Sequence, residues 1–599
     1  MGKHLQPRRS LSTLAVALLS VWCVGAKPAP AQSPQSEPDS VRGIVINSLT
    51  REPIGRALVY SRDNRFATMT DSEGRFEFTF AQAENKNDES ANISGTRTQV
   101  TCSDPSCTST HSSTFSYSLR RNGPDLLMAR KPGFLNDSNG PQTLQPQNTG
   151  KDLTISLTPE ALIVGRVVLA SSEASDSIQL ELYRRHVVDG RGRWFSAGTA
   201  SSRSNGEFRF AELSPGTYKL LTRELMDRDP LAFDPRGQLY AYPPVYFPTA
   251  TDFAAAQTIQ LAAAQIFQAN ISLVRHAYYP IKVPVANAPP GGINVVVSAQ
   301  GHRGPGYSLG YNNRDQTIEG TLPNGNYTLE AAGFGPNASS GLLNISVKSA
   351  AVEGPRMTMV PNGSIAVIVK EEFTSTEDTS SPTMIIRSGP PEMVGSGPSR
   401  YLSVILEPAD DFGQERTVSL RSPSGPEDDS LVINGVQPGR YWVKVNTNRG
   451  FVAAISSGTT DLLHQLLIVG LGGSGPPLEI TMRDASAEID GIIEGVAALP
   501  NRTDGAPSSS TGTAEHVYLI PLPDSSGEFK DIWVPPDGKF GPQQVPPGTY
   551  RVLAFDRPQE ALEYHNPEAM PAYEAKGSLV RLVAGQKEHL HLQLISSSE

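Results

Sequence analysis

Short runs in which apolar and polar residues alternate recur along the chain. Residues 153–157 (Leu-Thr-Ile-Ser-Leu), 478–482 and 590–594 are clear examples. Alternation of period two puts every second side chain on one face, which is typical of a half-buried antiparallel strand. The 53 glycines and 49 prolines fit short strands joined by tight turns better than long helices. The pattern predicts an all-β protein.

Four stretches share a Gly-x-Tyr sequence: LSPGTYKLLT, LPNGNYTLEA, VQPGRYWVKV and VPPGTYRVLAFD. Their tyrosines are separated by 109, 114 and 109 residues and are Tyr218, Tyr327, Tyr441 and Tyr550. A turn residue stands ten positions before each glycine, and two positions further on are Phe208, Thr317, Leu431 and Phe540. A turn, a strand, a second turn and another strand therefore recur at fixed offsets. This regularity predicts a repeated domain.

The repeat and the strands that open and close each copy predict the domain boundaries. A chain of 599 residues is too long for one hydrophobic core, which stops growing at roughly 250–300 residues. Copies of this size with about seven strands are typical of β-sandwiches. We predict a signal peptide, a linker and five sandwiches, at 1–31, 32–40, 41–158, 159–275, 276–361, 362–484 and 485–599, with a polar insertion at 81–125 in the first sandwich.

The conserved spacing around each repeated tyrosine favours a structural role. If the tyrosine begins a strand, it shares the apolar face with the residue two positions later, such as Leu220 after Tyr218. A buried phenol needs its hydroxyl bonded to nearby backbone, as in the tyrosine corner of Ig sandwiches. The intervening residues vary in chemistry and are expected to face outward: Lys219, Thr328, Trp442 and Arg551. Of these, Trp442 is a candidate contact residue.

Residues 41–80, VRGIVINSLTREPIGRALVYSRDNRFATMTDSEGRFEFTF, show a family pattern. Its elements are an opening-strand glycine, a proline and alanine before the second strand, and a Thr-Asp-x-x-Gly-x-Phe hairpin, at Gly43, Pro53, Ala57, Thr70, Asp71, Gly74 and Phe76. The segment resembles the start of a carboxypeptidase regulatory-like domain, a transthyretin-like sandwich found behind metallocarboxypeptidase domains and in many exported bacterial proteins. The resemblance is partial in the second and fifth copies, whereas the third and fourth rest mainly on the repeat spacing.

The repeat and the resemblance together predict the fold class. It is all-β, a tandem array of about five transthyretin-like or Ig-like antiparallel β-sandwiches. The related carbohydrate-binding-like fold implies sandwiches that sometimes bind glycans. In similar pilin-type sandwiches an acid promotes an isopeptide crosslink, and Glu330 stands where such an acid would, but no convincing lysine partner accompanies it.

The N-terminal segment has the layout of a secretory signal. Lys3, Arg8 and Arg9 precede the apolar run 11–26, and a small-residue site predicts cleavage after Ala31. The run falls short of the ~20 residues that a membrane-spanning helix needs, and no later stretch is long enough. We therefore expect no transmembrane segment in the mature chain. The expected location is outside the cytoplasm: periplasmic, outer-surface or secreted.

An exported location favours a disulfide between the two cysteines that remain after cleavage, Cys102 and Cys107. Two thiols alone cannot build a structural zinc site, which takes four ligands.

No catalytic, cofactor or metal motif is evident in the sequence. The net charge of −10, without a Lys/Arg block, argues against nucleic acid as a partner. The glycines at 470–475 have dinucleotide-loop spacing, but two prolines and a strand follow where a helix would have to begin. His589 and His591 share one strand face without an identifiable third ligand, which favours a solvated face over a metal site. We expect no cofactor and no enzyme activity.

Aromatic residues gather in QLYAYPPVYFPTATDF, where prolines stiffen the chain. The candidate ligand-binding residues there are Tyr240, Tyr242, Tyr246 and Phe247. Such rings can stack on sugars or grip a peptide at little entropic cost, or they can fold back and cap the sandwich. Trp194 and Trp533 are expected to be core or edge residues.

The function predicted from these features is binding or structural spacing at the cell envelope by an exported, non-enzymatic protein. One alternative is a carbohydrate-binding protein. Another is an accessory subunit of a peptidase or of an outer-membrane transport system. The expected partner is a glycan or an envelope protein.

Overall fold

The computed structural model describes most of the chain after residue 38. The described ranges are 39–61, 66–80, 92–99, 111–118, 126–135, 142–143, 152–169, 177–226, 237–299, 303–334, 338–374, 385–387, 400–412, 418–421, 430–473, 475–495, 515–523, 525–535 and 537–596. These residues form β-sheets and one short 3₁₀ helix, Met570–Tyr573. None of the helices found in them could cross a bilayer. The all-β prediction is confirmed.

Two sheets make up each of the first two units. In the first unit the sheet β4-β1-β10-β8 faces β3-β2-β7-β9. Its strands are β1 (Asp39–Asn47), β2 (Leu58–Ser61), β3 (Ala67–Met69), β4 (Arg75–Phe80), β7 (Leu126–Arg130), β8 (Phe134–Leu135), β9 (Gln142–Thr143) and β10 (Asp152–Pro159). In the second unit β14-β11-β19, with β20 beside β11, faces β13-β12-β15-β18. Its strands are β11 (Ala161–Leu169), β12 (Gln179–Val188), β13 (Arg191–Ser201), β14 (Glu207–Leu213), β15 (Gly216–Thr222), β18 (Ile259–Leu261), β19 (Ile266–Gln268) and β20 (Ile271–Leu273).

The third and fourth units repeat this arrangement. The third contains the order β16-β17-β21-β24-β23, with β27 and β28 beside β21, and the order β22-β25-β26-β29. Its strands are β16 (Leu225–Met226), β17 (Leu239–Tyr242), β21 (His276–Ala286), β22 (Ile293–Ala299), β23 (Gly310–Asn312), β24 (Thr317–Pro323), β25 (Gly325–Gly333), β26 (Ser339–Val347), β27 (Val352–Glu353), β28 (Met357–Thr358) and β29 (Val360–Pro361). The fourth contains β34-β30-β39-β36-β37 and β31-β32-β35-β38, with β33 beside β32. Its strands are β30 (Gly363–Glu372), β31 (Ile385–Arg387), β32 (Arg400–Pro408), β33 (Val418–Ser419), β34 (Val432–Val436), β35 (Gly439–Thr447), β36 (Phe451–Ser457), β37 (Thr460–Asp461), β38 (Leu467–Val469) and β39 (Leu478–Arg483).

The fifth unit is one continuous hydrogen-bonded sheet that folds over on itself. Its order is β42-β41-β44-β46-β40-β43, with β45 beside β44. The strands are β40 (Ala487–Glu494), β41 (Glu515–Pro521), β42 (Lys530–Val534), β43 (Lys539–Val545), β44 (Gly548–Phe555), β45 (Ser578–Leu582) and β46 (Lys587–Ile595). Residues from β40, β41, β43 and β44 meet in one core, so this sheet also encloses its apolar face.

Five clusters of buried apolar residues form the cores of the five units. They draw on residues from 41 to 157, 161 to 273, 281 to 359, 365 to 482 and 487 to 592. Each cluster lies inside one of the ranges predicted from the repeat, and these ranges are called units one to five below.

The predicted polar insertion of unit one contains β5 (Asn92–Gln99) and β6 (His111–Ser118), which pair with each other as a separate two-stranded sheet. Cys102 and Cys107 lie outside the described residues, so their disulfide stays a prediction.

The strand that closes each unit runs parallel to the strand that opens it. The pairs are β1 with β10, β11 with β20, β21 with β27 and β28, β30 with β39, and β40 with β46. We expected antiparallel pairing for these closing strands. Alternation along a strand specifies which residues are buried but not the direction of the neighbouring strand, so the sequence pattern could not distinguish the two.

A glycine in the opening strand makes room for a phenylalanine of the hairpin strand. Gly165 is paired with Phe208, and a Cβ atom at Gly165 would lie 2.8 Å from Phe208 Cζ. Gly43 with Phe76 and Gly491 with Phe540 repeat the arrangement in units one and five.

Units three and four fill the same space with two aliphatic residues. Val283 is paired with Ile318 and Ile365 with Ile433, and all four are buried. The repeat spacing predicts that Thr317 and Leu431 are equivalent to the phenylalanines of the other units. In the structure the equivalent residues are Ile318 and Ile433, one and two positions later. The prediction was wrong because the connection to the following tyrosine is shorter in these units.

The four repeated tyrosines are buried and bond to backbone, as predicted. Each hydroxyl donates to the carbonyl oxygen four residues earlier, at 2.6, 3.0, 2.8 and 2.7 Å for Tyr218, Tyr327, Tyr441 and Tyr550. Gly-x-Tyr is therefore a structural repeat in this fold, with the phenol holding the turn before its own strand.

Replacing Tyr550 by phenylalanine is expected to lower the stability of unit five by about 1–2 kcal/mol. The hydroxyl donates to Pro546 O and accepts from Glu528 N at 3.2 Å, so its loss leaves both groups without this partner. Thermal unfolding of the full chain would measure the effect. The control is Tyr573→Phe, in the 3₁₀ helix Met570–Tyr573. Equal melting of the two variants would contradict a structural role for the Tyr550 hydroxyl.

Units two and three share a sheet, which the sequence did not indicate. After β15 the chain of unit two crosses to unit three, where β17 pairs with β21 and β16 pairs with β17. The chain then returns and adds β18 to the sheet of unit two. The stretch predicted to be an aromatic loop thus begins as a strand.

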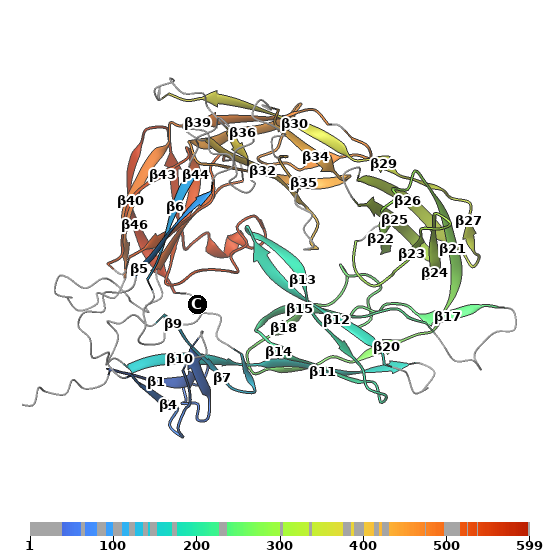
Figure 1. The fold of residues 1–599 in the computed structure, drawn as a ribbon, viewed down its shortest axis with the longest axis horizontal. Coiled ribbons are helices and arrows are strands. Elements are labelled where there is room, and N and C mark those ends of the chain that lie inside the picture. The colour runs from blue at the N-terminus through green and yellow to red at the C-terminus, as the bar shows by residue number, and fades with distance from the viewer. Residues whose placement is uncertain are drawn as a thin grey trace, which may run out of the picture.

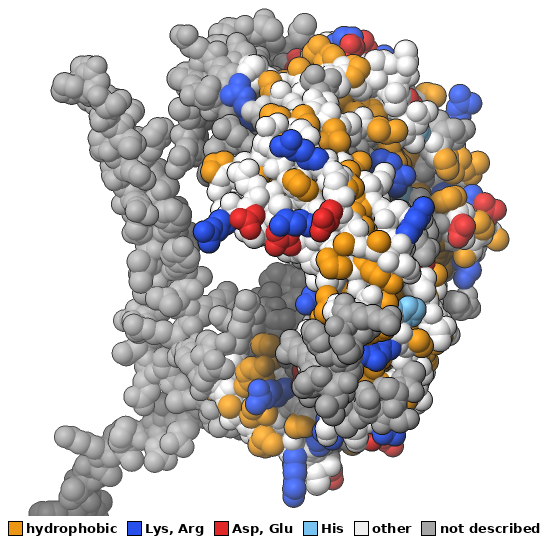
Figure 2. All heavy atoms as spheres, turned by 90° about the vertical axis from the view of Figure 1, so that its right-hand side faces the viewer, with side chains coloured by type: hydrophobic (Ala, Val, Ile, Leu, Met, Phe, Trp, Pro, Cys, Tyr) orange, Lys and Arg blue, Asp and Glu red, His pale blue; other side chains and the backbone are white. Residues whose placement is uncertain are grey.

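The five units follow one another around a ring (Figure 1). The hairpin formed by β12 and β13 points into the middle of this ring, toward units four and five. On the side drawn in Figure 2, positive, negative and apolar side chains are intermingled, which agrees with a net charge spread along the chain.

Candidate functional site

The aromatic residues predicted to bind a ligand are mostly buried. Tyr242, Tyr246 and Phe247 are 3%, 3% and 8% exposed. Tyr242 and Phe247 pack in the core of unit two, and the Tyr246 hydroxyl donates to Pro305 O of unit three. Protein covers these three rings, so they offer no stacking surface in this structure. Their position matches the other role considered for them, in which the aromatic segment folds back and caps the sandwich.

The remaining two candidates are half-buried beside arginines. Tyr240 on β17 has the Arg275 guanidinium 4.3 Å from its ring centroid. Trp442 on β35 has the Arg191 guanidinium 4.1 Å from its ring centroid. Trp442 thereby lies in the contact between units two and four, and ligand binding by Tyr240 or Trp442 stays a prediction.

The β12–β13 hairpin is the element that brings distant units together. Its two-residue turn, Asp189-Gly190, has φ values of 48° and 69°. Positive φ at both positions is the geometry of a type I′ turn, which Asp-Gly favours and which matches the twist of long paired strands. The hairpin extends beyond the core of unit two, and its tip contacts units four and five. We call this set of contacts the hub.

An aromatic cluster joins the base of the hairpin to unit four. Phe253 is central, with ring centroids 4.5 Å from Phe412, 5.4 Å from Tyr183 and 5.6 Å from Trp194. Phe412 belongs to unit four, and its edge-to-face contacts stabilise the interface beyond simple burial.

The aromatic cluster also encloses Lys219, which we had expected to face outward. Its ammonium donates to Phe253 O at 2.7 Å and to Ala254 O at 3.2 Å. Burial lowers its pKa, while Asp411 and Asp252 oppose that change. The face that appeared solvent-exposed from the repeat is covered in unit two by the hub.

A buried ion-pair network extends the same interface. Arg193 Nη2 lies 2.8 Å from Glu407 Oε1, and these side chains are only 3% and 5% exposed. Lys444 lies 2.9 Å from the other Glu407 oxygen and also pairs with Asp189 in the hairpin turn. Arg193 donates to Pro408 O at 3.1 Å as well. One carboxylate of unit four thus binds a cation from the hairpin and a cation from its own sheet.

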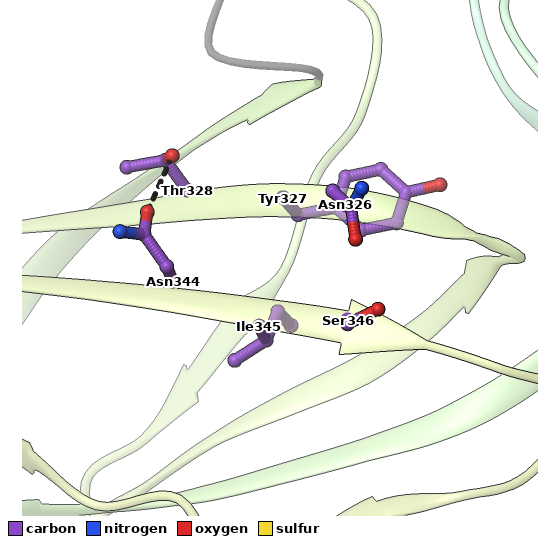
Figure 3. A pocket seen from close by; sticks show the side chains of 6 residues that line it. All are labelled: Asn326, Tyr327, Thr328, Asn344, Ile345 and Ser346. Carbon is purple, nitrogen blue, oxygen red and sulfur yellow. Dashed lines mark hydrogen bonds between the residues drawn. The ribbon is translucent and has the colours of Figure 1, made fainter.

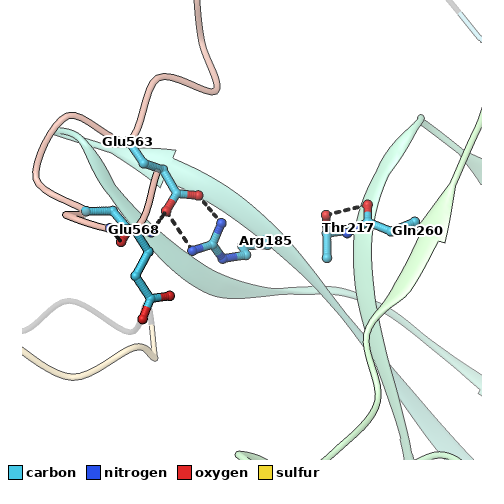
Figure 4. Close-up of polar contacts among 6 residues, drawn as sticks. Arg185, Thr217, Gln260, Glu563 and Glu568 are labelled. Carbon is cyan, nitrogen blue, oxygen red and sulfur yellow. Dashed lines mark hydrogen bonds and ion pairs between the residues drawn. The ribbon is translucent and has the colours of Figure 1, made fainter. Parts of the chain in front are cut away.

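Unit five contacts the hairpin through a bidentate arginine pair. Arg185 and Glu563 form two parallel contacts, one of them 2.8 Å long, and Figure 4 shows the two groups facing each other. His565 N donates to Gly190 O at 3.1 Å. A Cβ atom at Gly190 would lie 2.7 Å from the Tyr564 ring, so only glycine permits this approach.

Burial and neighbouring positive charges keep His565 neutral. Burial is the larger cause, and together with the nearby Arg191 and Lys444 it lowers the pKa of His565 to about 3. For Glu563 burial acts to raise the pKa, but hydrogen bonds from Arg185 and Asn566 outweigh it and the pKa is lowered. At neutral pH the hub therefore holds the ionised Glu563 against Arg185, with the neutral His565 imidazole nearby.

An arginine of unit three forms an ion pair with unit four. Arg303 lies 2.5 Å from Glu330 in its own unit and also pairs with Asp410 of unit four. Glu330, the residue at the position of an isopeptide-promoting acid, is thus engaged in an ion pair with arginine.

The junction of units two and three contains a carboxyl group with a strongly raised pKa. Glu224 lies between β15 and β16, and burial raises its pKa to about 7, partly offset by the neighbouring Tyr278 hydroxyl. The protonated form is favoured by the folded state. Its contribution to stability is complete below pH ~4.5 and is lost as the pH rises through 7.

Glu224→Gln is expected to flatten the dependence of stability on pH between about 5 and 8. The raised pKa of Glu224 corresponds to a change in the free energy of unfolding on the order of 3 kcal/mol as the carboxyl group ionises. The amide of glutamine does not ionise, so the variant lacks this change. Thermal melting across this pH range would measure it, with Glu207→Gln on the exposed side of β14 as control. A parallel pH profile for wild type and Glu224→Gln would contradict the prediction.

The described surface also has a shallow depression of about 270 Å³ on unit three. Its lining comes from two adjacent strands, β25 and β26 (Figure 3), and consists of Asn326, Tyr327, Thr328, Asn344, Ile345 and Ser346. Thr328 donates to Asn344 at 2.7 Å across the strands, and Tyr327 is a core tyrosine. The depression has no charged side chain and no exposed aromatic ring in its lining.

Comparisons with known proteins show no family for this chain. No protein-family model matches it, and no curated protein matches it significantly. Among solved structures, the TIE protein of Bacillus anthracis aligns at 10% identity over 73% of this chain and 74% of that chain, with a TM-score of 0.13. A streptococcal ancillary pilin aligns at 12% identity over 54% and 100%, with a TM-score of 0.16.

Two B repeat units of the collagen-binding protein of Staphylococcus aureus align at 11% identity over 75% of this chain and all of that chain, with a TM-score of 0.12. TM-scores this low carry no argument about function. The function proposed below therefore rests on the residues and contacts of this chain.

Proposed function

We propose that the protein is an exported, non-enzymatic scaffold that presents the surfaces of five β-sandwiches in a fixed arrangement at the cell envelope. The observation that carries this proposal is the hub. A binding protein built as a flexible string would have no need of a buried contact between units two, four and five. The signal-like N-terminus supports export.

The hub favours a fixed arrangement because its contacts are unusually costly to break. Arg193 and Glu407 are almost completely buried, and separating them would expose one desolvated charge without its partner. The aromatic cluster around Phe253 must also be exposed when unit four moves away. The shared sheet of units two and three removes a further degree of freedom, because β17 and β21 are hydrogen-bonded.

Small-angle scattering and fractionation test the two parts of this proposal. We expect the mature chain to have a radius of gyration near that of a compact particle, on the order of 25–30 Å. A much larger value, as for an extended string of five units, would refute the fixed arrangement. Recovery of the native protein in the cytoplasmic fraction would refute export.

Glycan binding is a second candidate function, and one exposed residue favours it. Trp533 lies on the edge strand β42, and its large apolar surface is open to solvent. Exposed tryptophan is uncommon and offers a rigid stacking surface. A polysaccharide pull-down with wild type, Trp533→Ala and Tyr240→Ala would test it, and no retention of the wild type on any polysaccharide would exclude this function.

An accessory role beside a peptidase or an outer-membrane transport system remains a proposal as well. A fixed scaffold suits such a role because it can hold two partners at a set distance. Crosslinking and purification from an envelope fraction would test it, with recovery of the protein alone counting against it.

A further inference from the structure

Two solvent-exposed histidines lie side by side on the outer face of unit five. His589 and His591 are two residues apart on β46, and the buried Leu590 between them points into the core. Their ring centroids are 5.1 Å apart. The side chains are 54% and 60% exposed, so a small ion can reach both rings from solvent.

A carboxylate from the neighbouring strand accompanies each of these rings. In the parallel pairing of β40 with β46, Asp490 stands directly beside His589. His589 Nδ1 lies 2.5 Å from Asp490 Oδ1, and His591 Nδ1 lies 3.8 Å from Glu494 Oε1. Metal-binding histidines commonly give one ring N–H to a carboxylate, which fixes the ring and raises the basicity of the other nitrogen. His589 Nδ1 is hydrogen-bonded to its carboxylate, and His591 Nδ1 faces Glu494 at ion-pair distance, which points to Nε2 of each ring as the ligand atom.

We propose that His589 and His591 form a two-histidine binding site for a divalent transition-metal ion, with Cu²⁺ preferred. Imidazole is a good ligand for Cu²⁺, Ni²⁺ and Zn²⁺, and the general order of affinity favours Cu²⁺. Among the described residues no group of three or more potential ligands is arranged to hold a metal ion. The proposed site therefore has two protein ligands, with water as the remaining ones. Such a site is open and exchangeable, unlike a closed structural zinc site.

The local charge also favours a cation. Asp490 and Glu494 add two carboxylates beside the rings, while the next pair along the strands, Glu488 with Lys587 at 2.9 Å, is balanced. Binding of a dication by two neutral imidazoles is therefore supported by carboxylates that already orient them.

Another histidine of unit five provides a control with the same carboxylate contact, although its side chain is only 15% exposed. His516 Nδ1 lies 2.7 Å from Asp531 Oδ1, which reproduces the carboxylate contact, but its stacked neighbour is Tyr518 and not a second imidazole. If a single carboxylate-held ring were enough to bind the ion, His516 would contribute as much as His591.

The test is calorimetric titration of the tag-free mature chain with Cu²⁺. We expect wild type and His516→Ala to bind equally, with micromolar affinity, and His591→Ala to bind at least tenfold more weakly. Asp490→Asn keeps both imidazoles and is expected to lose about tenfold through its effect on ring orientation. Electron paramagnetic resonance of the wild-type complex should show two equatorial nitrogens.

Two results would overturn the proposal. One is equal Cu²⁺ affinity in wild type and His591→Ala. The other is an equal loss in His516→Ala and His591→Ala, which would mean general binding by surface histidines. The side chains of His591 and Asp490 are exposed, so these two variants are expected to keep the circular dichroism and melting of the wild type. The same measurements check the folding of His516→Ala, and they do so independently of metal.

Discussion

Replacing Glu407 by alanine is expected to open the hub. The contact between units two and four would be destabilised by about 3–5 kcal/mol. The carboxylate lies 2.8 Å from Arg193 and 2.9 Å from Lys444. Its removal takes this carboxylate away from the Arg193 guanidinium, which is almost fully buried at the interface. The desolvation cost of that guanidinium is then no longer offset, which is why loss of one partner is more damaging than loss of both.

The opening would be measured by scattering and hydrogen exchange. We expect a larger radius of gyration and faster exchange in β12, β13 and β32, with the core strands of unit one unchanged. Glu479→Ala is the matched control, because Glu479 pairs with Lys370 on the exposed side of unit four. Exposed pairs contribute at most about 1 kcal/mol. If Glu407→Ala matched this control in both measurements, the hub would not hold the ring together.

Replacing Gly165 by alanine is expected to destabilise unit two by about 3 kcal/mol, the upper end for overpacking, or to prevent its folding. A Cβ atom there would lie 1.7 Å from Ala269 O and 2.8 Å from Phe208 Cζ. The first contact is with backbone of the strand segment that follows β19, so a change of side-chain rotamer cannot relieve it. The opening strand would have to move away from its parallel neighbour.

A second glycine separates this effect from the general cost of altering a strand glycine. Gly541 on β43 has nothing within 4 Å of its would-be Cβ, so Gly541→Ala is expected to be neutral or slightly stabilising. Urea unfolding of both variants would compare them. Equal midpoints would show that the close approach at Gly165 is not needed for the fold.

The sequence predicted the parts of the fold that depend on local patterns. Alternation identified strands such as β10 and β46, and the Gly-x-Tyr repeat identified a buried phenol bonded to its own turn. These features are local because each depends on residues within about ten positions of one another. The pairing direction of the closing strands depends on residues between 71 and 111 positions apart, and alternation contains no information about it.

The candidate site was predicted less well, because burial there depends on contacts between units. Tyr242, Tyr246 and Phe247 look like an exposed aromatic loop when only neighbouring residues are considered. In the structure Tyr242 and Phe247 pack in the core of unit two, while Tyr246 packs in the cluster around Phe253 and bonds to Pro305 O of unit three. The sequence contained one indication of the hub, because Asp189-Gly190 between two strands is typical of a two-residue hairpin turn. This dipeptide does not indicate that the hairpin contacts units four and five.

The crossing of unit two into the sheet of unit three constrains how the protein can be made. As the chain leaves the ribosome, β16 and β17 emerge before β21. These two strands of unit two therefore stay unpaired with unit three until β21 has been synthesised. Residues 159–275 expressed alone would expose that unpaired edge, which is a known route to aggregation. The smallest piece containing unit two that is expected to fold without this exposed edge therefore runs from 159 to 361. Glu407 and Glu563 are synthesised later still, so during synthesis the hub can form only after units four and five have emerged.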